Sequence, residues 1–329
     1  MENLYNTSLE FTRWLQENFP QLAGFFKLLT DTGAEEFYVA LLPLIYWCIN
    51  KRLGKILVYV LFVSVTINTM LKHALRQPRP FWIDPAVAID ATGGYGIPSG
   101  HTQYATTIYL LVAAAIGSVW AWIVALFLIL VMGFSRVYVG AHFIHDVVAG
   151  FLVGLIILVI ALVGQKQFGK AFSRRILGQR MMLAMLVVIT IAAVYILILY
   201  LIGAPDLSVP WAGFIPQAEI DSITEMASAI GALLGVSVGI LLEGSRVRFR
   251  ADGPLSKRIA RYLLGIAITV IVWRGLGYIF PREPLAIAIP LRIFRYFLVT
   301  LWASYYAPWL FVRLGLADSD PAPGLNLRL

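Results

Sequence analysis

Long apolar runs separated by short polar stretches dominate the chain from residue 34 onward. Nine such runs can be distinguished, over residues 34–50, 54–72, 101–117, 120–138, 143–165, 181–203, 223–243, 260–280 and 286–312. Several of them reach the ~20 residues with which an α-helix crosses the hydrocarbon core of a bilayer. The pattern therefore predicts an all-α, polytopic membrane helix bundle with about nine transmembrane helices.

The two ends of the chain follow different patterns. In residues 1–33, apolar and aromatic residues alternate with charged ones, and Pro20 interrupts the segment. A segment with this much charge does not span a membrane, and we expect an amphipathic segment that lies at the interface. The sequence is rich in Pro and Gly from Asp318 onward, so we expect residues 317–329 to form a flexible tail.

Composition and charge support a membrane protein. The chain has 329 residues, of which 60% are apolar and 13% are charged, and its mean hydropathy is +0.80. The net charge of +8 comes largely from the basic loops at 50–55, 164–180 and 243–261. Basic loops mark the cytoplasmic side of membrane proteins, so we expect no nucleic-acid partner and an N-terminus that faces outside. Cys48 is the single cysteine, which excludes a disulfide within the chain.

The stretch from Ser135 to Asp146 joins two apolar runs and carries candidate chemistry. His142 and Asp146 are four residues apart, a spacing that places both on one face of a helix. A carboxylate that binds one imidazole nitrogen leaves the other free to act as a nucleophile or a base. Arg136 adds a permanent cation whose forked donors suit a phosphate group.

Two earlier stretches extend this pattern. They contain Lys72 with Arg79-Pro80, and then Pro98-Ser99-Gly100-His101. In chain order the three stretches read Lys-x6-Arg-Pro, Pro-Ser-Gly-His and Ser-Arg-x5-His-x3-Asp. This signature resembles that of the type 2 phosphatidic acid phosphatase superfamily, which includes lipid phosphate phosphatases, glucose-6-phosphatase and the vanadium haloperoxidases. The resemblance covers roughly residues 34–165, the expected catalytic core, and residues 166–316 would form a four-helix membrane extension. Many members of the family have a spanning helix where this chain has its amphipathic segment.

The residue types suit phosphoryl transfer, in which spread negative charge must be held while a P–O bond breaks. Lys72, Arg79 and Arg136 supply three cations, and Ser99 offers a hydroxyl group. The backbone around Gly100 can approach a phosphate closely, at the start of a helix whose dipole favours an anion. These residues would form a phosphate-binding pocket without a metal ion or another cofactor.

The resemblance also implies catalytic roles. His142 would attack phosphorus to give a phosphohistidine, and Asp146 would orient it. His101 would protonate the leaving alkoxide and then activate the water that hydrolyses the intermediate.

Two other sites can be built from the same residues. A zinc site would use His101, His142, His145 and Asp146. Three nearby cations oppose a metal dication, so we do not favour it. A serine hydrolase triad of Ser99, His101 and Asp146 is disfavoured because acyl transfer has no need for three cations. We expect His73 and His145 to support the site indirectly or to lie at the interface.

The C-terminal half offers packing signals. Gly231, Gly235 and Gly239 repeat every four residues, which indicates a small-residue face for close helix packing. Arg292 and Arg295 lie three residues apart within an apolar run, and we expect their face to point into the bundle.

These features predict a metal-independent membrane phosphatase that hydrolyses a lipid phosphate or pyrophosphate. All three motifs fall at the same ends of their predicted helices, opposite the basic loops. We therefore expect an extracytoplasmic active site in the inner (cell) membrane of a bacterium. Two alternatives remain open: a phosphotransferase that passes the phosphoryl group to an alcohol, and a phosphatase fused to a lipid-transport module in residues 181–329. The sequence makes no prediction about oligomeric state.

Overall fold

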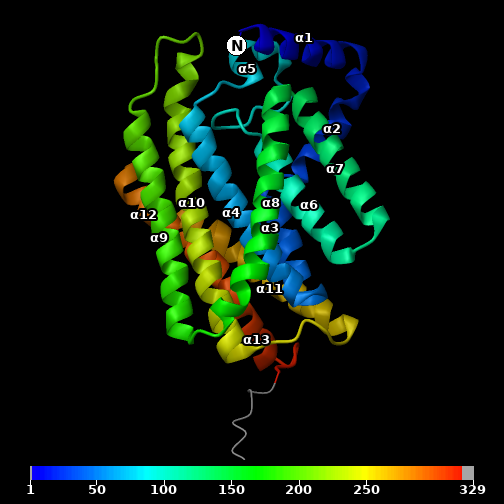
Figure 1. Ribbon diagram of the computed structural model, residues 1–329, viewed down its shortest axis with the longest axis vertical. Helices are drawn as coiled ribbons and strands as arrows, with labels where there is room; N and C mark the ends of the chain where they lie inside the picture. The colour runs from blue at the N-terminus through cyan, green and yellow to red at the C-terminus, as the bar shows by residue number, and fades with distance from the viewer. Residues whose placement is uncertain (1, 321–329) are drawn as a thin grey trace, which may run out of the picture. The chain divides into compact units, whose positions relative to one another are not determined.

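The regular structure of the protein is built from helices. The computed structural model describes residues 2–320 (Figure 1). Its α-helices are α1 (Glu2–Asn18), α2 (Ala23–Asp31), α3 (Glu35–Leu44), α4 (Lys51–Leu75), α5 (Pro80–Ile83), α6 (Gly100–Ile116), α7 (Val119–Tyr138), α8 (Ile144–Ser173), α9 (Leu177–Ile202), α10 (Ile215–Leu242), α11 (Leu255–Ile279), α12 (Leu285–Leu301) and α13 (Ala307–Arg313). Short π-helical segments follow three of them, at Ile45–Ile49, Glu243–Val247 and Trp302–Tyr306.

The prediction of a polytopic membrane helix bundle is confirmed. Within residues 2–320, seven helical segments are long and apolar enough to cross a membrane. The other two predicted runs form shorter helices. The run at 34–50 becomes α3 and the π-helical segment after it, and the run at 101–117 becomes α6, which has 17 residues.

The chain divides into two compact units that interleave along the sequence. The first contains Met1–Tyr38, Val60–Lys170 and Thr190–Ala229, and the second contains Val39–Tyr59, Ala171–Ile189 and Ile230–Leu329. Residues 190–229, which the sequence assigned to the C-terminal extension, thus belong to the unit that contains the signature motifs. Four long helices, α4, α8, α9 and α10, contribute residues to both units.

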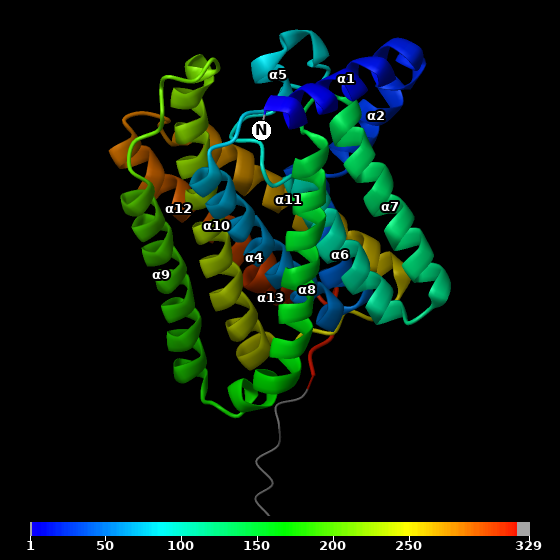
Figure 2. The same cartoon turned by 45° about the horizontal axis from the view of Figure 1, so that its top comes forward.

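In the first unit, the N-terminal segment packs onto the loops that precede α8. Helix α1 lies across the ends of α7 and α8 in both views (Figures 1 and 2). Tyr5 packs against Phe143 in a tilted arrangement, with ring centroids 4.8 Å apart, and Gln16 Nε2 donates hydrogen bonds to the carbonyl groups of Val87 and Tyr138. The segment therefore braces the loop between α7 and α8.

Two glycines of α8 bring the start of α6 against this helix. A Cβ atom on Gly150 would lie 2.5 Å from the Ser99 carbonyl oxygen, and one on Gly154 would lie 2.7 Å from that of Gln103. Real side chains do not tolerate such contacts, so only glycine allows the helices to approach this closely. The approach aligns the first turn of α6 with the first turn of α8, where Ser99 N donates to the Asp146 carbonyl oxygen at 2.9 Å.

In the second unit, the predicted glycine face packs helix against helix. Cβ atoms on Gly231, Gly235 and Gly239 would each collide with α12 or with the π-helical segment that follows it. Arg295 lies against Gly277 of α11, with its Cζ 3.0 Å from the position of an added Cβ. The glycine face and the inward direction of Arg295 agree with the sequence analysis.

The beginning of the expected tail is hydrogen-bonded in the second unit. Ser319 forms an isolated antiparallel bridge with Phe249, and Arg250 N donates to the Asp318 carbonyl oxygen at 2.8 Å. The chain is thus held as far as Asp320, and the rest of the expected tail, 321–329, lies outside the described residues.

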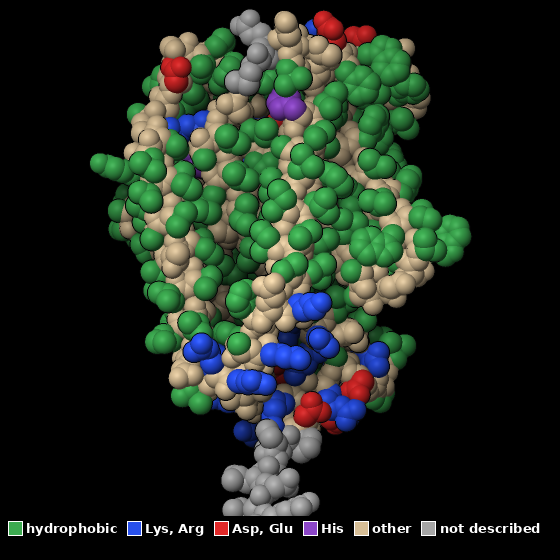
Figure 3. Space-filling view, in the orientation of Figure 1, with side chains coloured by type: hydrophobic (Ala, Val, Ile, Leu, Met, Phe, Trp, Pro, Cys, Tyr) green, Lys and Arg blue, Asp and Glu red, His purple; other side chains and the backbone are tan. Residues whose placement is uncertain are grey.

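Apolar side chains cover the exposed faces of α7 and α8 in the space-filling view (Figure 3). Basic side chains on this face gather around the turn between α8 and α9, where Lys166, Lys170, Arg174 and Arg175 are exposed. This distribution is the one expected of helices that face lipid along their length and anionic headgroups at one end.

Candidate active site

His142 lies in the short turn between α7 and α8, and the local sequence fixes its direction. Gly140 has a φ of +72° at this turn, and a Cβ atom there would collide with the Val87 carbonyl oxygen. The turn is closed by the Arg136 carbonyl group, which accepts hydrogen bonds from the backbone N–H groups of Ala141 and His142. His142 is 1% exposed, so its ring direction is set by protein contacts.

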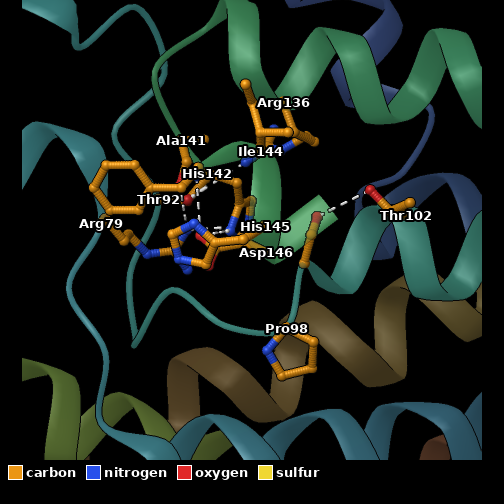
Figure 4. A network of polar contacts seen from close by, with 12 residues as sticks. Arg79, Thr92, Pro98, Thr102, Arg136, Ala141, His142, Ile144, His145 and Asp146 are labelled. Carbon is orange, nitrogen blue, oxygen red and sulfur yellow. Dashed lines mark hydrogen bonds and ion pairs between the residues drawn. The ribbon is translucent and has the colours of Figure 1, made fainter. Parts of the chain in front are cut away.

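The His142 ring lies between a carboxylate and a guanidinium group (Figure 4). Its Nδ1 atom is 3.3 Å from Asp146 Oδ2, and its Nε2 atom is 3.3 Å from Arg79 Nη1. Asp146 Oδ2 also accepts the backbone N–H of Phe143 at 3.0 Å, because Asp146 lies in the first turn of α8. The carboxylate therefore favours the tautomer in which Nδ1 carries the proton and Nε2 is free.

The charges around His142 favour its neutral form. Burial lowers the pKa of the imidazole well below its ordinary value, and the positive charges of Arg79, Arg136 and Lys72 lower it further. His101 lowers the pKa of His142 in the same direction, with a smaller effect. A neutral imidazole with a free Nε2 is the form that can attack an electrophile.

Arg79 is 1% exposed and is held by backbone carbonyl groups. Its Nε and Nη2 atoms donate to the carbonyl oxygens of Gly94 and Gly93 at 2.7 and 2.6 Å, and Nη1 donates to that of Ala141 at 3.0 Å. Within residues 2–320 no carboxylate lies within 4 Å of its guanidinium group. Arg79 therefore keeps its positive charge available beside His142 Nε2.

The other two expected cations differ in their partners. Lys72, in the last turn of α4, is 8% exposed, and no carboxylate of the described chain lies within 4 Å of its Nζ atom. Arg136 is fully buried and forms an ion pair with Asp90 at 3.0 Å and a hydrogen bond with Thr30 at 2.9 Å. Arg136 is thus partly neutralised, whereas Lys72 and Arg79 are not.

The start of α6 supplies the remaining expected residues. Gly100 is the first residue of the helix, and Ser99 precedes it without capping it through its side chain. Ser99 Oγ instead accepts a hydrogen bond from Thr102 Oγ1 at 3.1 Å. The first N–H groups of α6 are therefore left for an anion, as at other helix N-termini. His101 packs against Gly33, in the turn between α2 and α3.

This geometry does not support the two alternative sites. Asp146 directs its carboxylate to His142 rather than to His101, so the described chain holds no Ser99–His101–Asp146 triad. A metal ion on His142 Nε2 would meet the Arg79 guanidinium group, and no group of three or more potential ligands in residues 2–320 could hold a metal ion. His145 Nε2 lies 3.3 Å from Asp146 Oδ1, which makes it an indirect neighbour of His142.

Several supporting residues come from parts of the chain that the motifs do not include. On α10, Asp221 accepts the backbone N–H of Gly94, and Glu219 bonds to His73, Arg76 and Tyr95. His73, which we expected to support the site indirectly or to lie at the interface, contacts this helix and α9: its Nε2 lies 3.0 Å from Glu219, and its Nδ1 lies 2.7 Å from the Tyr195 hydroxyl group. The available signal was two carboxylates near the start of an apolar run, because buried charge in a membrane protein is costly without a partner.

Comparisons with known proteins agree with these motifs. The model of the PAP2 superfamily matches residues 53–170, and that of the PAP2 superfamily phosphatase transmembrane extension matches residues 227–319. The chain is 29% identical over 154 residues to lipid phosphate phosphatase delta of Arabidopsis thaliana, covering 42% of this chain and 37% of the relative. It is 30% identical over 143 residues to sphingosine-1-phosphate phosphatase 1 of Mus musculus, covering 41% and 33%.

An archaeal relative is covered over more of its length. The undecaprenyl-diphosphatase of Sulfolobus acidocaldarius is 28% identical over 145 residues, which cover 42% of this chain and 69% of the relative. For the plant and mouse relatives the match spans only about a third to two fifths of their length. No solved structure matches the chain.

Proposed function

The chain belongs to the PAP2 superfamily, and we propose that it is a metal-independent membrane phosphatase that hydrolyses a lipid phosphate or pyrophosphate. The observation that carries this proposal is the position of His142. Its Nδ1 atom contacts the Asp146 carboxylate, and its unprotonated Nε2 atom faces the guanidinium group of Arg79. That guanidinium group has no carboxylate partner in the described chain. A nucleophile beside an available cation is the arrangement that phosphoryl transfer requires.

In the first step, His142 Nε2 attacks phosphorus, and the bond between phosphorus and the bridging oxygen breaks. The electron pair of that bond leaves with the lipid oxygen, which takes a proton from His101. Arg79 and Lys72 stabilise the negative charge on the non-bridging oxygens, and the N–H groups at the start of α6 bind the same oxygens. The product is a phosphohistidine, with the proton of Nδ1 held by Asp146.

In the second step, water attacks the phosphohistidine. His101, which lost its proton in the first step, accepts a proton from this water as the new P–O bond forms. The bond between phosphorus and Nε2 breaks, its electron pair returns to His142, and inorganic phosphate is released.

The charges at the two ends of α8 support an extracytoplasmic site. The helix has 30 residues, so its ends lie about 45 Å apart. Asp146 is in its first turn, and the exposed Lys166 and Lys170 are near its last turns. Since basic residues favour the cytoplasmic side, the end that carries Asp146 belongs on the outer side.

A site at the outer end of a membrane-spanning helix suits a lipid better than a soluble phosphate. A lipid can present its headgroup at the interface while its chains stay in the bilayer, which avoids a cost of about 0.8 kcal/mol for each exposed methylene group. We therefore expect long-chain substrates such as phosphatidic acid, sphingosine 1-phosphate or undecaprenyl diphosphate to have a higher kcat/KM than glucose 6-phosphate.

Phosphate release by the purified protein in lipid nanodiscs tests the proposal. The panel contains these four substrates, and the matched control is the His142→Ala variant, checked for folding by its melting temperature. Release from at least one lipid by the wild type, and none by the variant, supports the proposal. Equal rates for the two proteins would contradict it. Formation of a phosphorylated alcohol when an acceptor is added, without phosphate release in its absence, would identify a phosphotransferase.

A further inference from the structure

Asp221 of helix α10 contacts the loop whose carbonyl groups bind Arg79. Asp221 lies in the part of α10 that belongs to the first unit, 142 residues from Arg79 along the chain. It lies outside both segments that match the family models, 53–170 and 227–319.

A single peptide group joins Asp221 to Arg79. The N–H of Gly94 donates to Asp221 Oδ2 at 3.0 Å, and the carbonyl oxygen of Gly93 accepts from Arg79 Nη2 at 2.6 Å. These two atoms belong to the same peptide unit, because the carbonyl carbon of Gly93 is bonded to the nitrogen of Gly94. The order along this contact is therefore carboxylate, N–H, C=O and guanidinium.

Such an order strengthens both hydrogen bonds. The carboxylate attracts the N–H end of the peptide dipole, which increases the negative charge on the carbonyl oxygen at the other end. The guanidinium group acts on the same dipole in the same sense, and each hydrogen bond has one ionised partner. Asp221 thus acts as an indirect counter-ion of Arg79 and leaves the Nη1 atom that faces His142 unneutralised.

The local sequence is adapted to this contact. Gly94 has a φ of +72°, and a Cβ atom on Gly93 would lie 2.5 Å from Asp221 Oδ2. A residue with a side chain at either position would strain the turn or displace the carboxylate. Asp221 is itself fixed, because its Oδ1 atom accepts a hydrogen bond from Gln217 Nε2 at 2.8 Å, one helical turn earlier.

We propose that Asp221 is a positioning residue for the phosphatase reaction, which sets the place of the Arg79 guanidinium group through the Gly93–Gly94 peptide. This inference rests on the proposed function, because it gives Arg79 its task at the transferring phosphoryl group. A cation that stabilises a transition state must be held within a fraction of an ångström, and Asp221 supplies that restraint from a helix outside the catalytic motifs.

A double-mutant cycle between Asp221 and Arg79 tests the proposal. Four proteins are compared, namely the wild type, Asp221→Asn, Arg79→Lys and the double variant, with orthovanadate affinity from calorimetry and with kcat and KM. Asn can still accept the Gly94 N–H but has no charge, so Asp221→Asn should lower kcat and vanadate affinity about tenfold. In the Arg79→Lys background the same substitution should have an effect below about twofold, because coupled residues are not additive.

Asp221→Ala removes the acceptor as well as the charge, and its loss of vanadate affinity should exceed that of Asp221→Asn. The matched control is Asp206→Asn, an exposed carboxylate that bonds to Ser208 in its own loop, which should leave every value unchanged. Full additivity in the cycle, or wild-type vanadate affinity in both Asp221 variants, would overturn the proposal. Vanadate binding requires only the anion site, so it tests the coupling between Asp221 and Arg79 even if no lipid is hydrolysed. The proposed function is tested separately, by phosphate release from lipids.

Discussion

The two units each contain a cluster of buried charge, and the clusters differ in whether their charges are paired. In the second unit, the side chain of Glu243 is fully buried and accepts from Lys51 Nζ at 2.6 Å, from Lys55 Nζ at 3.0 Å and from the Phe249 N–H at 3.0 Å. In the first unit, Lys72 and Arg79 are nearly as buried, but no carboxylate of the described chain lies within 4 Å of either.

Burying a charge costs several kcal/mol unless a partner compensates for it. The Glu243 cluster is compensated by the protein itself, so it needs no ligand and joins segments of the second unit. In the cluster around Lys72 and Arg79, backbone carbonyl groups compensate the charge of Arg79 in part. A bound anion would therefore stabilise this cluster more than the Glu243 cluster. The comparison therefore separates a structural charge cluster from a ligand-binding one by the completeness of its pairing.

The largest expected effect comes from removing a cation of the incompletely paired cluster. Arg79→Met should lower kcat/KM by about 10²–10³-fold, the usual loss when one donor to a developing negative charge is removed. Lys51→Met, the matched change in the Glu243 cluster, should leave kcat/KM of the folded protein within about threefold of wild type, because it acts on no reacting group. Phosphate release from the preferred lipid measures both, and a comparable loss in the two variants would remove the distinction between the clusters.

The opposite pattern is expected for stability. Removing one partner of a buried ion pair costs about 3–5 kcal/mol, and the partial exposure of Lys51 and Lys55 reduces this figure. Glu243→Gln should therefore lower the melting temperature by several degrees in the same detergent while kcat is retained. An unchanged melting temperature would show that the Glu243 cluster contributes little to folding.

A smaller effect is expected from pH. The pKa of His142 is lowered in the folded protein, so below about pH 6.5 the unfolded chain binds a proton that the folded protein does not. The stability that His142 contributes is present above this pH and is lost as the pH falls through the lowered pKa. Melting temperatures between pH 7.5 and 5 should fall more for the wild type than for His142→Gln, and identical slopes would contradict the lowered pKa.

No effect is expected from removing metal ions. Arg79 and Lys72 supply the positive charge that a metal ion would supply in a metallophosphatase, and Arg79 lies at the free nitrogen of His142. Excess EDTA should leave kcat unchanged, whereas orthovanadate should inhibit. Loss of activity with EDTA and its return with zinc or magnesium would show that the cation cluster is insufficient.

Much of the site could be predicted because it is local in sequence. The four-residue spacing of His142 and Asp146 at the start of a helix sets their contact through helix geometry alone. The apolar runs likewise predict most of the long helices, since the length of a spanning helix is set by the thickness of the bilayer rather than by tertiary contacts.

The supporting contacts could not be predicted because they join distant segments. Asp221 and Gly94 are 127 residues apart, and no local pattern shows that the start of α10 meets this loop. The same holds for the partners of Arg136: Thr30 belongs to a segment expected only to lie at the interface, and Asp90 to an irregular loop. Such pairs depend on how helices pack, which periodicity does not specify.

The most direct test of the account is a search for the covalent intermediate. The protein is mixed with a lipid phosphate labelled with ³²P, quenched in alkali within one turnover, and digested, and the labelled peptide is identified by mass spectrometry. The account predicts alkali-stable, acid-labile phosphate on His142, absent from His142→Ala. Label on Ser99 or another residue, or full turnover by a folded His142→Ala protein, would contradict the central role of His142.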